Sequence, residues 1–411
     1  MPILLEEDLQ RPLPRMYRVR QQFDETRLED VAGTVRAELA QPEIRALVKP
    51  GMRIAVGVGS RGIQNLYTTV ETTVNSLKEL GAEPFIVSAM GSHGGGTEEG
   101  QREVLAGYGI TEERLGVPVV TTVDTVYLGN CANGRPVWFD RAAYEADLIV
   151  PINRVKLHTD FVGPIQSGLC KMLVIGLGNH KGCSAVHEEA PEVFADAIEE
   201  TARLILQKAP VGFGIAILEN AYDKTYAVEA VPAEHLVERE KELVQIAKGN
   251  MPYIMLDEAD VIVCGAIGKD ISGAGFDPNI LGRSSVLKQF VLHIPRYQRL
   301  VLCDVTPASH GNGIGVGLFD VITKKVAEQL DLESMYANAI ACNCLGDASV
   351  PCTVDDEETA IRVALKCCRN IDRDHPRIIR IQNTLHLGEI EVSEALLDAV
   401  RADSRMSLIE N

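Results

Sequence analysis

Short apolar runs alternate along the chain with longer stretches in which apolar residues recur every three or four positions. The run RIAVGVG at 53–59 precedes such a stretch at 63–81, and PFIVSAMG at 84–91 precedes another at 97–109. Runs of the first kind predict buried strands, and stretches of the second kind predict amphipathic helices. This order of elements favours an α/β fold, with a mainly parallel sheet that helices cover on both faces.

The alternation continues and then starts again after a charged helical stretch at 232–250. Further strands are predicted at 117–123, 136–140, 148–153, 211–220, 260–268, 299–306 and 377–384, and further helices at 190–209 and 355–368. A chain of 411 residues is longer than one hydrophobic core usually supports. We therefore predict two α/β domains with mainly parallel sheets, at residues 1–255 and 256–411.

The net charge of −18 limits the classes of partner. Nucleic-acid binding needs a positive surface that displaces counterions, so no nucleic-acid partner is expected. An anionic substrate would need a local basic pocket that acts against the overall field. The apolar runs are too short to cross a bilayer and the N-terminus lacks a signal-peptide pattern, so we expect no membrane partner and a cytoplasmic location.

The ten cysteines do not have the spacing of a metal cluster. Cys342 and Cys344 form a C-x-C pair, Cys367 and Cys368 are adjacent, and the others are scattered, often inside apolar runs. Because no C-x-x-C pair exists, zinc ribbons and ferredoxin-type clusters are not expected. We predict buried, reduced thiols.

Residues with useful chemistry follow several of the predicted strands. In open α/β sheets, ligands bind beyond the carboxyl ends of the strands. The loops at those ends carry Arg61, His93, Lys156 with His158, and Lys269 with Asp270. We therefore expect these side chains on one functional edge.

The sequence GVGSRG at 57–62 matches G-x-G-x-x-G between a strand and a helix, which is typical of dinucleotide-binding sites. Such sites also need an acidic residue at the end of the second strand, where PFIVSAMGSHGG offers none. The alternative is a tight turn at a helix N-terminus, which would hold a phosphate or carboxylate together with Arg61.

His93 lies among glycines in MGSHGGGTEEG at 90–100. The glycines leave room for a ligand beside an imidazole, a group that ordinarily titrates near neutral pH, so a general acid or base is the favoured interpretation. A flexible turn with an incidental histidine is the alternative. Thr97 is expected to cap the following helix.

The stretch KLHTDFVGPIQSGLCKMLVIGLGNHKGCSAVH at 156–187 places lysines and histidines in an apolar, glycine-spaced segment. A lysine that is desolvated in such a segment, as Lys171 would be, becomes a nucleophile. A neutral imidazole such as that of His187 is a common ligand of nickel, zinc, copper or iron. The alternative is a lysine that extends from a helix to the surface, with a surface histidine.

The order of four features resembles the nickel-pincer lactate racemase family. These features are the segment SHGGGTEEGQ, the histidine in VKLHTDFVG, a lysine after a glycine, and a histidine sixteen residues after that lysine. The resemblance covers roughly residues 15–400 and is strongest at 84–190. The segments GKDISGAGFDPNILGR and SHGNGIGVGLFD are similar to less characterised homologues rather than to lactate racemase itself.

The resemblance implies two α/β domains with the active site in the cleft between them. It implies a nickel-pincer nucleotide, a modified pyridinium mononucleotide with two sulfur-containing arms, joined to Lys171 as a thioamide, with His187 as the nickel ligand. His93 and His158 match the paired histidines that take and return the hydroxyl proton while a hydride moves from the substrate's Cα to the cofactor and back. Arg61 would bind the substrate carboxylate.

The sequence departs from the family pattern at positions that concern the substrate. Val58 stands where the lactate racemases have an Asp, Gly94 where they have an Arg, and the spacing from His158 to Lys171 is three residues longer. Their Gln and Lys pair in the second domain is not clearly present, although Lys269, a candidate substrate-binding residue, lies nearby. We therefore expect the central machinery to be kept and the substrate to differ from lactate.

The favoured function is a racemase or epimerase of a 2-hydroxy acid. The alternatives are another redox or elimination reaction on a hydroxy acid, and a relative that binds a nucleotide or metal without catalysis. The expected partners are a small hydroxy acid and the cofactor-biosynthesis enzymes, and a homo-oligomer is possible on this sequence. The sequence does not name the hydroxy acid or give a role to the cysteines.

Overall fold

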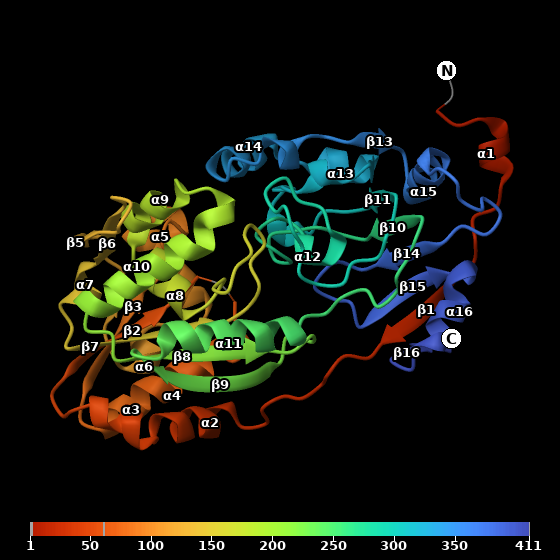
Figure 1. Ribbon diagram of the computed structural model, residues 1–411. Coiled ribbons are helices and arrows are strands. Elements are labelled where there is room, and N and C mark those ends of the chain that lie inside the picture. Colours follow the sequence, from red (N-terminus) through yellow and green to blue (C-terminus); the bar gives the residue numbers. More distant parts are fainter. Residues whose placement is uncertain (1–2, 61, 411) are drawn as a thin grey trace. The chain divides into compact units, whose positions relative to one another are not determined.

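The computed structural model describes residues 3–60 and 62–410, and the chain divides into two compact units (Figure 1). One unit is Glu25–Met251, and the other combines the chain up to Asp24 with the chain from Pro252 onward. Each unit has its own sheet and is described by itself. The fold is α/β with two mixed, mostly parallel sheets, which confirms the predicted fold class.

The sheet of Glu25–Met251 has six strands in the order β4-β3-β2-β7-β8-β9. All neighbours in it are parallel except β8 and β9. The strands of this unit, including the separate antiparallel pair β5-β6, are β2 (Arg53–Val58), β3 (Glu83–Ser88), β4 (Val119–Val120), β5 (Thr125–Asn130), β6 (Pro136–Asp140), β7 (Leu148–Arg154), β8 (Phe213–Glu219) and β9 (Thr225–Pro232). Its helices are α2 (Val31–Leu39), α3 (Pro42–Leu47), α4 (Leu66–Glu79), α5 (Glu98–Gly107), α6 (Glu112–Leu115), α7 (Arg141–Tyr144), α8 (Leu169–Lys171), α9 (Asn179–His187), α10 (Phe194–Lys208) and α11 (Leu236–Gly249).

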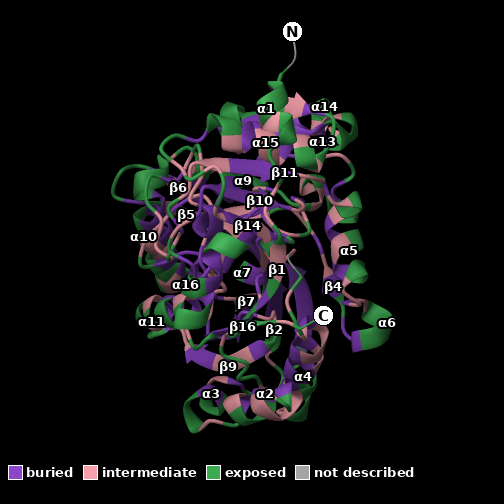
Figure 2. Ribbon diagram, turned by 90° about the vertical axis from the view of Figure 1, so that its right-hand side faces the viewer, coloured by how far each residue is buried: buried purple, intermediate pink, exposed green. Residues whose placement is uncertain are grey.

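The core of this unit lies between the sheet and its helices, because strands and helices bury matching apolar faces. Ile54, Val56 and Val58 of β2 are fully buried, and so are Val70 and Val74 on one face of α4. Figure 2 shows the central strands β2 and β7 as buried and the outer helices α6 and α11 with exposed residues. This packing holds the ends of the parallel strands in fixed positions.

The sheet of the other unit has eight strands in the order β13-β12-β11-β10-β14-β15-β1-β16. The first five are parallel neighbours, and the last three join antiparallel. The strands are β1 (Met16–Gln21), β10 (Val261–Cys264), β11 (Arg299–Leu302), β12 (Val321–Thr323), β13 (Cys352–Val354), β14 (Ile378–Ile381), β15 (Glu389–Ser393) and β16 (Met406–Leu408). The helices are α1 (Glu6–Gln10), α12 (Pro278–Leu281), α13 (Lys324–Gln329), α14 (Leu332–Ala341), α15 (Glu357–Cys367) and α16 (Leu397–Ala402).

The first 24 residues lie outside the unit to which the predicted range 1–255 assigned them. Strand β1 pairs with β15 and β16 in the eight-stranded sheet. Its last residue, Gln21, is fully buried and binds the returning chain: Nε2 donates to the carbonyls of Tyr253 (3.2 Å) and Leu387 (2.7 Å), and Oε1 accepts from the amide of Met255 (2.7 Å). The chain therefore starts in one unit, builds the other and returns at Pro252.

Among residues 3–60 and 62–410, no helix combines the length and the apolar character that a bilayer crossing requires. All ten cysteines are thiols rather than disulfides. Six are buried, whereas Cys342, Cys352 and Cys367 are exposed and Cys303 is intermediate. The prediction of reduced thiols is confirmed, and the prediction of burial is confirmed for the six.

Replacing Gln21 by Ala should lower the free energy of unfolding by about 3 kcal/mol, because two buried backbone groups and one partly buried one would each lose a hydrogen-bond partner. Gln22→Ala, at the exposed neighbouring position, should change it by less than about 0.5 kcal/mol. Urea denaturation measures both values, and hydrogen exchange at the Met255 amide should speed up only in the first variant. Equal effects of the two substitutions would contradict the role assigned to Gln21.

Candidate active site

Three neighbouring strands of the six-stranded sheet present candidate residues at their carboxyl ends. The strands are β3, β2 and β7, and the loops after them carry His93, Ser60 and His158 respectively. The chain order reverses between β2 and β7, which is the topological switch point where open α/β sheets bind ligands. Arg61, which follows β2, lies outside the described residues.

Lys269 does not share this edge, and the prediction of one common edge is wrong for it and for Asp270. Both follow β10, which belongs to the eight-stranded sheet of the other unit. There the Lys269 ammonium donates to the carbonyl of Gly273 (2.7 Å) and its backbone amide donates to the Ser309 hydroxyl (2.8 Å). Strand prediction alone does not say which strands share a sheet.

The loop that carries His93 is shaped by glycine. Gly94, Gly95 and Gly96 all have φ angles between 65° and 67°, a left-handed conformation that other residues rarely adopt. Thr97 then caps α5 by accepting from the Gly100 amide (3.2 Å), as predicted. The imidazole is exposed, and its Nδ1 contacts the hydroxyl of Ser60 at the end of β2.

The loop that carries His158 is closed at its base. Lys156 and Ser167 form a two-way backbone bridge (2.9 and 3.1 Å), and the amide of His158 donates to the side chain of Gln166 (2.8 Å). Phe161, buried in the same loop, stacks on the imidazole with ring centres 4.3 Å apart. The position of the His158 ring is therefore fixed both by the hydrogen bond of its backbone amide and by the stacking of Phe161 on the ring face.

The imidazole of His158 makes polar contacts through both of its nitrogens. Its Nδ1 accepts from the backbone amide of Asp160 (3.0 Å), and its Nε2 contacts Nζ of Lys171. Lys171 also lies over the ring of Phe161, with Nζ 5.9 Å from the ring centre. Two candidate residues that are 13 positions apart in sequence thus meet directly.

Lys171 ends α8, and the chain continues as a π-helix over Met172–Gly176. Such π-helical turns occur often at functional sites. This one packs closely against the end of β3: the Gly91 amide donates to the Gly176 carbonyl (3.0 Å), and a Cβ on Gly176 would lie 2.7 Å from the carbonyl oxygen of Ala89. The π-helix therefore ties the Lys171 segment to the loop of His93.

His187 is the last residue of α9, and although the residue is exposed as a whole, its Nδ1 contacts are partly buried. Its Nδ1 lies 2.7 Å from the carbonyl oxygen of Cys183 and 3.5 Å from the Cys183 sulfur. Because a carbonyl only accepts, Nδ1 carries the proton and Nε2 keeps its lone pair. Burial by neighbouring groups lowers the pKa of His187, but the bonds to Cys183 outweigh this and raise the pKa above its ordinary value.

Two phenylalanine rings connect the histidines. Phe194 meets the ring of His187 edge-on at 5.1 Å and lies 4.8 Å from Phe161, which stacks on His158. Both phenylalanines are buried. His158, Lys171 and His187 therefore belong to one cluster with an apolar side.

Two buried carboxyl groups, which the sequence interpretation missed, anchor the segment between Lys171 and His187. Glu240 of α11 accepts from the amide of Cys170 (2.8 Å) at the start of α8. Asp140 accepts from the amide of Ala143 (2.8 Å) and from the side chain of Asn179 (2.9 Å) at the start of α9. Burial raises the pKa of Glu240 to about 7 and that of Asp140 to about 6, against the effect of these hydrogen bonds.

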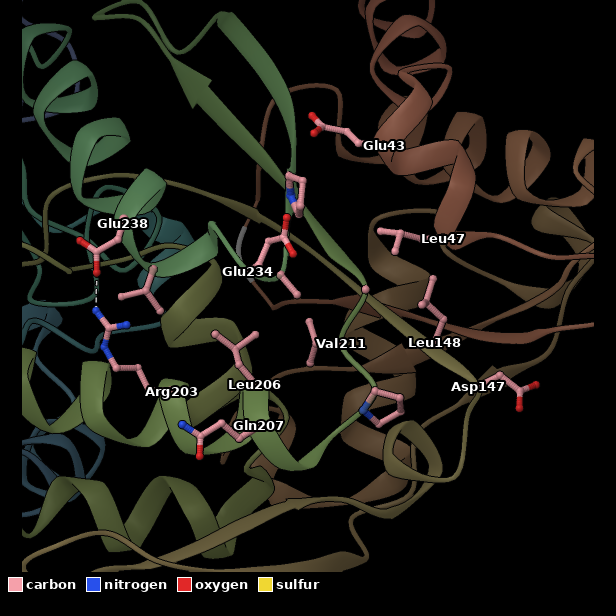
Figure 3. A pocket seen from close by; sticks show the side chains of 15 residues that line it. Glu43, Leu47, Asp147, Leu148, Arg203, Leu206, Gln207, Val211, Glu234 and Glu238 are labelled. Carbon is pink, nitrogen blue, oxygen red and sulfur yellow. Dashed lines mark hydrogen bonds and ion pairs between the residues drawn. The ribbon is translucent and has the colours of Figure 1, made fainter.

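A concave pocket in the same unit does not coincide with the cluster (Figure 3). It is lined by Asp147 and Leu148 at the start of β7 and by Gly212 just before β8, so it lies at the amino ends of these strands. Its rim includes Glu43 and Glu234. The candidate residues lie at the opposite, carboxyl ends.

Glu240→Gln should change how stability depends on pH. A folded-state pKa near 7 means that wild type gains stability from the bound proton at low pH and loses it as the pH rises from about 4.5 to 7, whereas glutamine stays neutral. The free energy of unfolding of the variant relative to wild type should therefore rise by about 3 kcal/mol across this range. Urea denaturation at several pH values measures it, with the exposed Glu242→Gln on the same helix as the control. Parallel curves for wild type and Glu240→Gln would contradict the assigned burial.

The comparisons with known proteins concern both the family and the fold. Residues 11–196 match the family model described as the lactate racemase N-terminal domain. The lactate racemase apoprotein from Thermoanaerobacterium thermosaccharolyticum is similar in structure, with a TM-score of 0.53 and 13% sequence identity over 89% of this chain and 93% of that chain. A Thermotoga maritima protein has a TM-score of 0.49 and 13% identity over 80% of this chain and 85% of that chain.

No curated protein sequence matches the chain significantly. At 13% identity, the likeness to the lactate racemase apoprotein shows the fold alone. The family model is the finding that concerns descent, and it covers the β2, β3 and β7 loops together with Lys171 and His187. Residues 11–196, somewhat less than half of the chain, are thus similar to the lactate racemase N-terminal domain family.

Proposed function

We propose that this protein is a racemase or epimerase of a 2-hydroxy acid other than lactate and that it uses a nickel-pincer nucleotide joined to Lys171. The observation that carries the proposal is the cluster of Lys171, His158 and His187 at the switch point of the six-stranded sheet. The cluster lies within residues 11–196, which match the lactate racemase N-terminal domain model. The likeness of residues 11–196 to that family supports the isomerase class, and the activity, the cofactor and the substrate class are all part of the proposal.

The residues present fit the cofactor. The hydrogen bond from Nδ1 of His187 to the Cys183 carbonyl leaves Nε2 as the free ligand nitrogen, which is the usual arrangement of a metal-binding histidine. Lys171 would carry the covalent link, and Phe161 provides an apolar surface beneath its amine. The chemistry that such a group supplies when bound is the reversible uptake of the hydride on the substrate's Cα.

His93 and His158 are the proposed proton carriers. Inversion needs a base for each enantiomer, and the two residues follow strands on either side of β2. Each imidazole is held through Nδ1, that of His93 by the Ser60 hydroxyl and that of His158 by the Asp160 amide. The buried Phe161 and Phe194 lower the access of water to the cluster.

The substrate proposal rests on Val58 and Gly94, which stand where the family resemblance places polar residues in the lactate racemases. Arg61 is the proposed substrate-binding residue, and a basic residue is needed because the protein is acidic overall. The proposed partners are a small hydroxy acid and the enzymes that build the cofactor.

His187→Ala should lose nickel. Protein produced together with the cofactor-building enzymes should hold about one nickel per chain, and the substitution should lower this at least about tenfold, as expected when a ligand is lost. His180→Ala, at an exposed position of the same helix, should retain nickel. Elemental analysis of the purified proteins makes the measurement. Equal nickel contents in the two variants would exclude His187 as the ligand.

His93→Ala should abolish inversion without loss of nickel. Removal of a positioned general base typically lowers the rate at least about 100-fold, so optical rotation of a panel of 2-hydroxy acids should show exchange with wild type and none with the variant. If the wild-type protein inverts none of the acids although it is fully occupied by nickel, the racemase proposal is contradicted. Normal exchange by His93→Ala would contradict the role of this histidine.

A further inference from the structure

The concave pocket at the amino ends of β7 and β8 has the size of a small-molecule site. Its volume is about 620 Å³, and sites for small ligands in proteins usually span about 300–1,000 Å³. All the residues that line it belong to the unit Glu25–Met251 (Figure 3). We call it the amino-edge pocket, because it lies at the edge of the sheet away from the candidate active site.

Much of the lining of the amino-edge pocket is apolar. Leu148, Val211 and Val237 line it and are buried, so they form a close-packed base. Leu47 and Leu206 also line it and are half-buried, so part of each side chain is in contact with water. Because apolar surface gains free energy when it is removed from water, the pocket favours a ligand with a hydrocarbon body.

The charged residues of the lining are mostly acidic. Glu43, Asp147, Glu234 and Glu238 supply four carboxylates, and Arg203 supplies one guanidinium. Arg203 forms an ion pair with Glu238. Four carboxylates against one guanidinium leave a surplus of three negative charges, in a protein whose net charge is −18. The pocket therefore favours a cation and disfavours an anion such as a hydroxy acid.

The three carboxylates that Arg203 does not pair with are exposed and can accept from a ligand. Asp147 accepts from the backbone amide of Arg53 (2.8 Å), and Glu234 lies 3.4 Å from Nε2 of His235. Within residues 3–60 and 62–410, the side chain of Glu43 makes no hydrogen bond or ion pair. Each exposed ion pair contributes little to binding, so a ligand must also use the apolar lining.

The carboxylates lie on different sides of the apolar lining. Glu43 comes from α3 and Asp147 from the turn before β7, whereas Glu234 and Glu238 come from the turn before α11 and from α11 itself. In Figure 3, Val211 lies between Glu234 and Asp147. This arrangement suits a molecule whose positive charges are separated by a hydrocarbon chain.

We infer that the amino-edge pocket is a binding site for a linear aliphatic diamine or polyamine. The ammonium groups of such a ligand contact the carboxylates, and its methylene chain covers the apolar lining. An inorganic cation such as Mg²⁺ meets the charge but leaves the apolar lining in water. The inference goes beyond the proposed function and does not depend on it, because it uses no residue of the candidate active site.

Calorimetric titration of the full chain with 1,8-diaminooctane at pH 7 and low salt tests the inference, and one molecule per chain should bind. The neutral 1,8-octanediol has the same length and should bind at least about fivefold more weakly, because it forms no ion pairs. The doubly charged 1,3-diaminopropane should bind at least about tenfold more weakly, because it buries fewer methylene groups. Binding of Mg²⁺ or 1,3-diaminopropane as tightly as 1,8-diaminooctane would overturn the inference.

Two double variants separate the pocket from the general negative charge of the protein. Glu43→Gln with Glu234→Gln removes a carboxylate from each side of the pocket and should weaken the binding of 1,8-diaminooctane about fivefold. Glu103→Gln with Glu113→Gln removes two exposed carboxylates of the same unit outside the pocket and should leave the affinity unchanged. Equal weakening in both double variants would show a general charge effect and overturn the inference.

Hydrogen exchange of wild type locates the bound diamine without any substitution. Saturating 1,8-diaminooctane should slow amide exchange at the end of α10 and at the start of α11, which line the pocket. Exchange in the loops of His93 and His158 should stay unchanged. Slower exchange in those loops alone, or at neither place, would overturn the inference.

Discussion

The backbone amide of Cys170 donates to the buried carboxylate of Glu240, and this hydrogen bond fixes the turn from which Lys171 projects. The carboxylate can come this close because residue 168 is glycine: a Cβ there would lie 2.5 Å from Cδ of Glu240. An acidic side chain at the N-terminus of a helical turn is also favoured by the backbone amides there, which have no hydrogen-bond acceptor within the turn. The position of the lysine relative to His158 thus depends on a residue of a different helix, α11.

Backbone groups then set the two rings in opposite tautomers. The Asp160 amide places the proton of His158 on Nε2, and the Cys183 carbonyl places the proton of His187 on Nδ1. The second arrangement leaves the lone pair of His187 on Nε2, which suits a metal ion. Two histidines of one segment can therefore have different chemistry without any difference in residue type.

The sequence predicted the α/β class and most strands, because alternation of apolar and polar residues is a local signal. It predicted β6 at the bounds that the structure has, and it predicted Thr97 as a helix cap. It did not place β1, since pairing with β15 joins residues more than 360 positions apart. For the same reason it put Lys269 at the wrong sheet edge.

Within the candidate site, the sequence pointed to the residues of the family motif but not to the residues that hold them in place. Glu240 lies in the charged stretch VEREKELV, where one more acid attracts no notice. It does, however, occupy the buried stripe of α11 together with Leu236, Val237, Leu243 and Val244. An acid at an apolar position of the helical period is the signal that could have found it. The π-helix that follows Lys171 was not predicted by any sequence pattern.

The central claim is that Lys171 is the attachment point of a nickel-binding group. The most direct test is the intact mass of the protein produced together with the cofactor-building enzymes, followed by peptide mapping of the segment from Lys156 to His187. The account predicts a mass increase that maps to Lys171 and to no other lysine. An unmodified Lys171 under these conditions, or an adduct on a different residue, would contradict it.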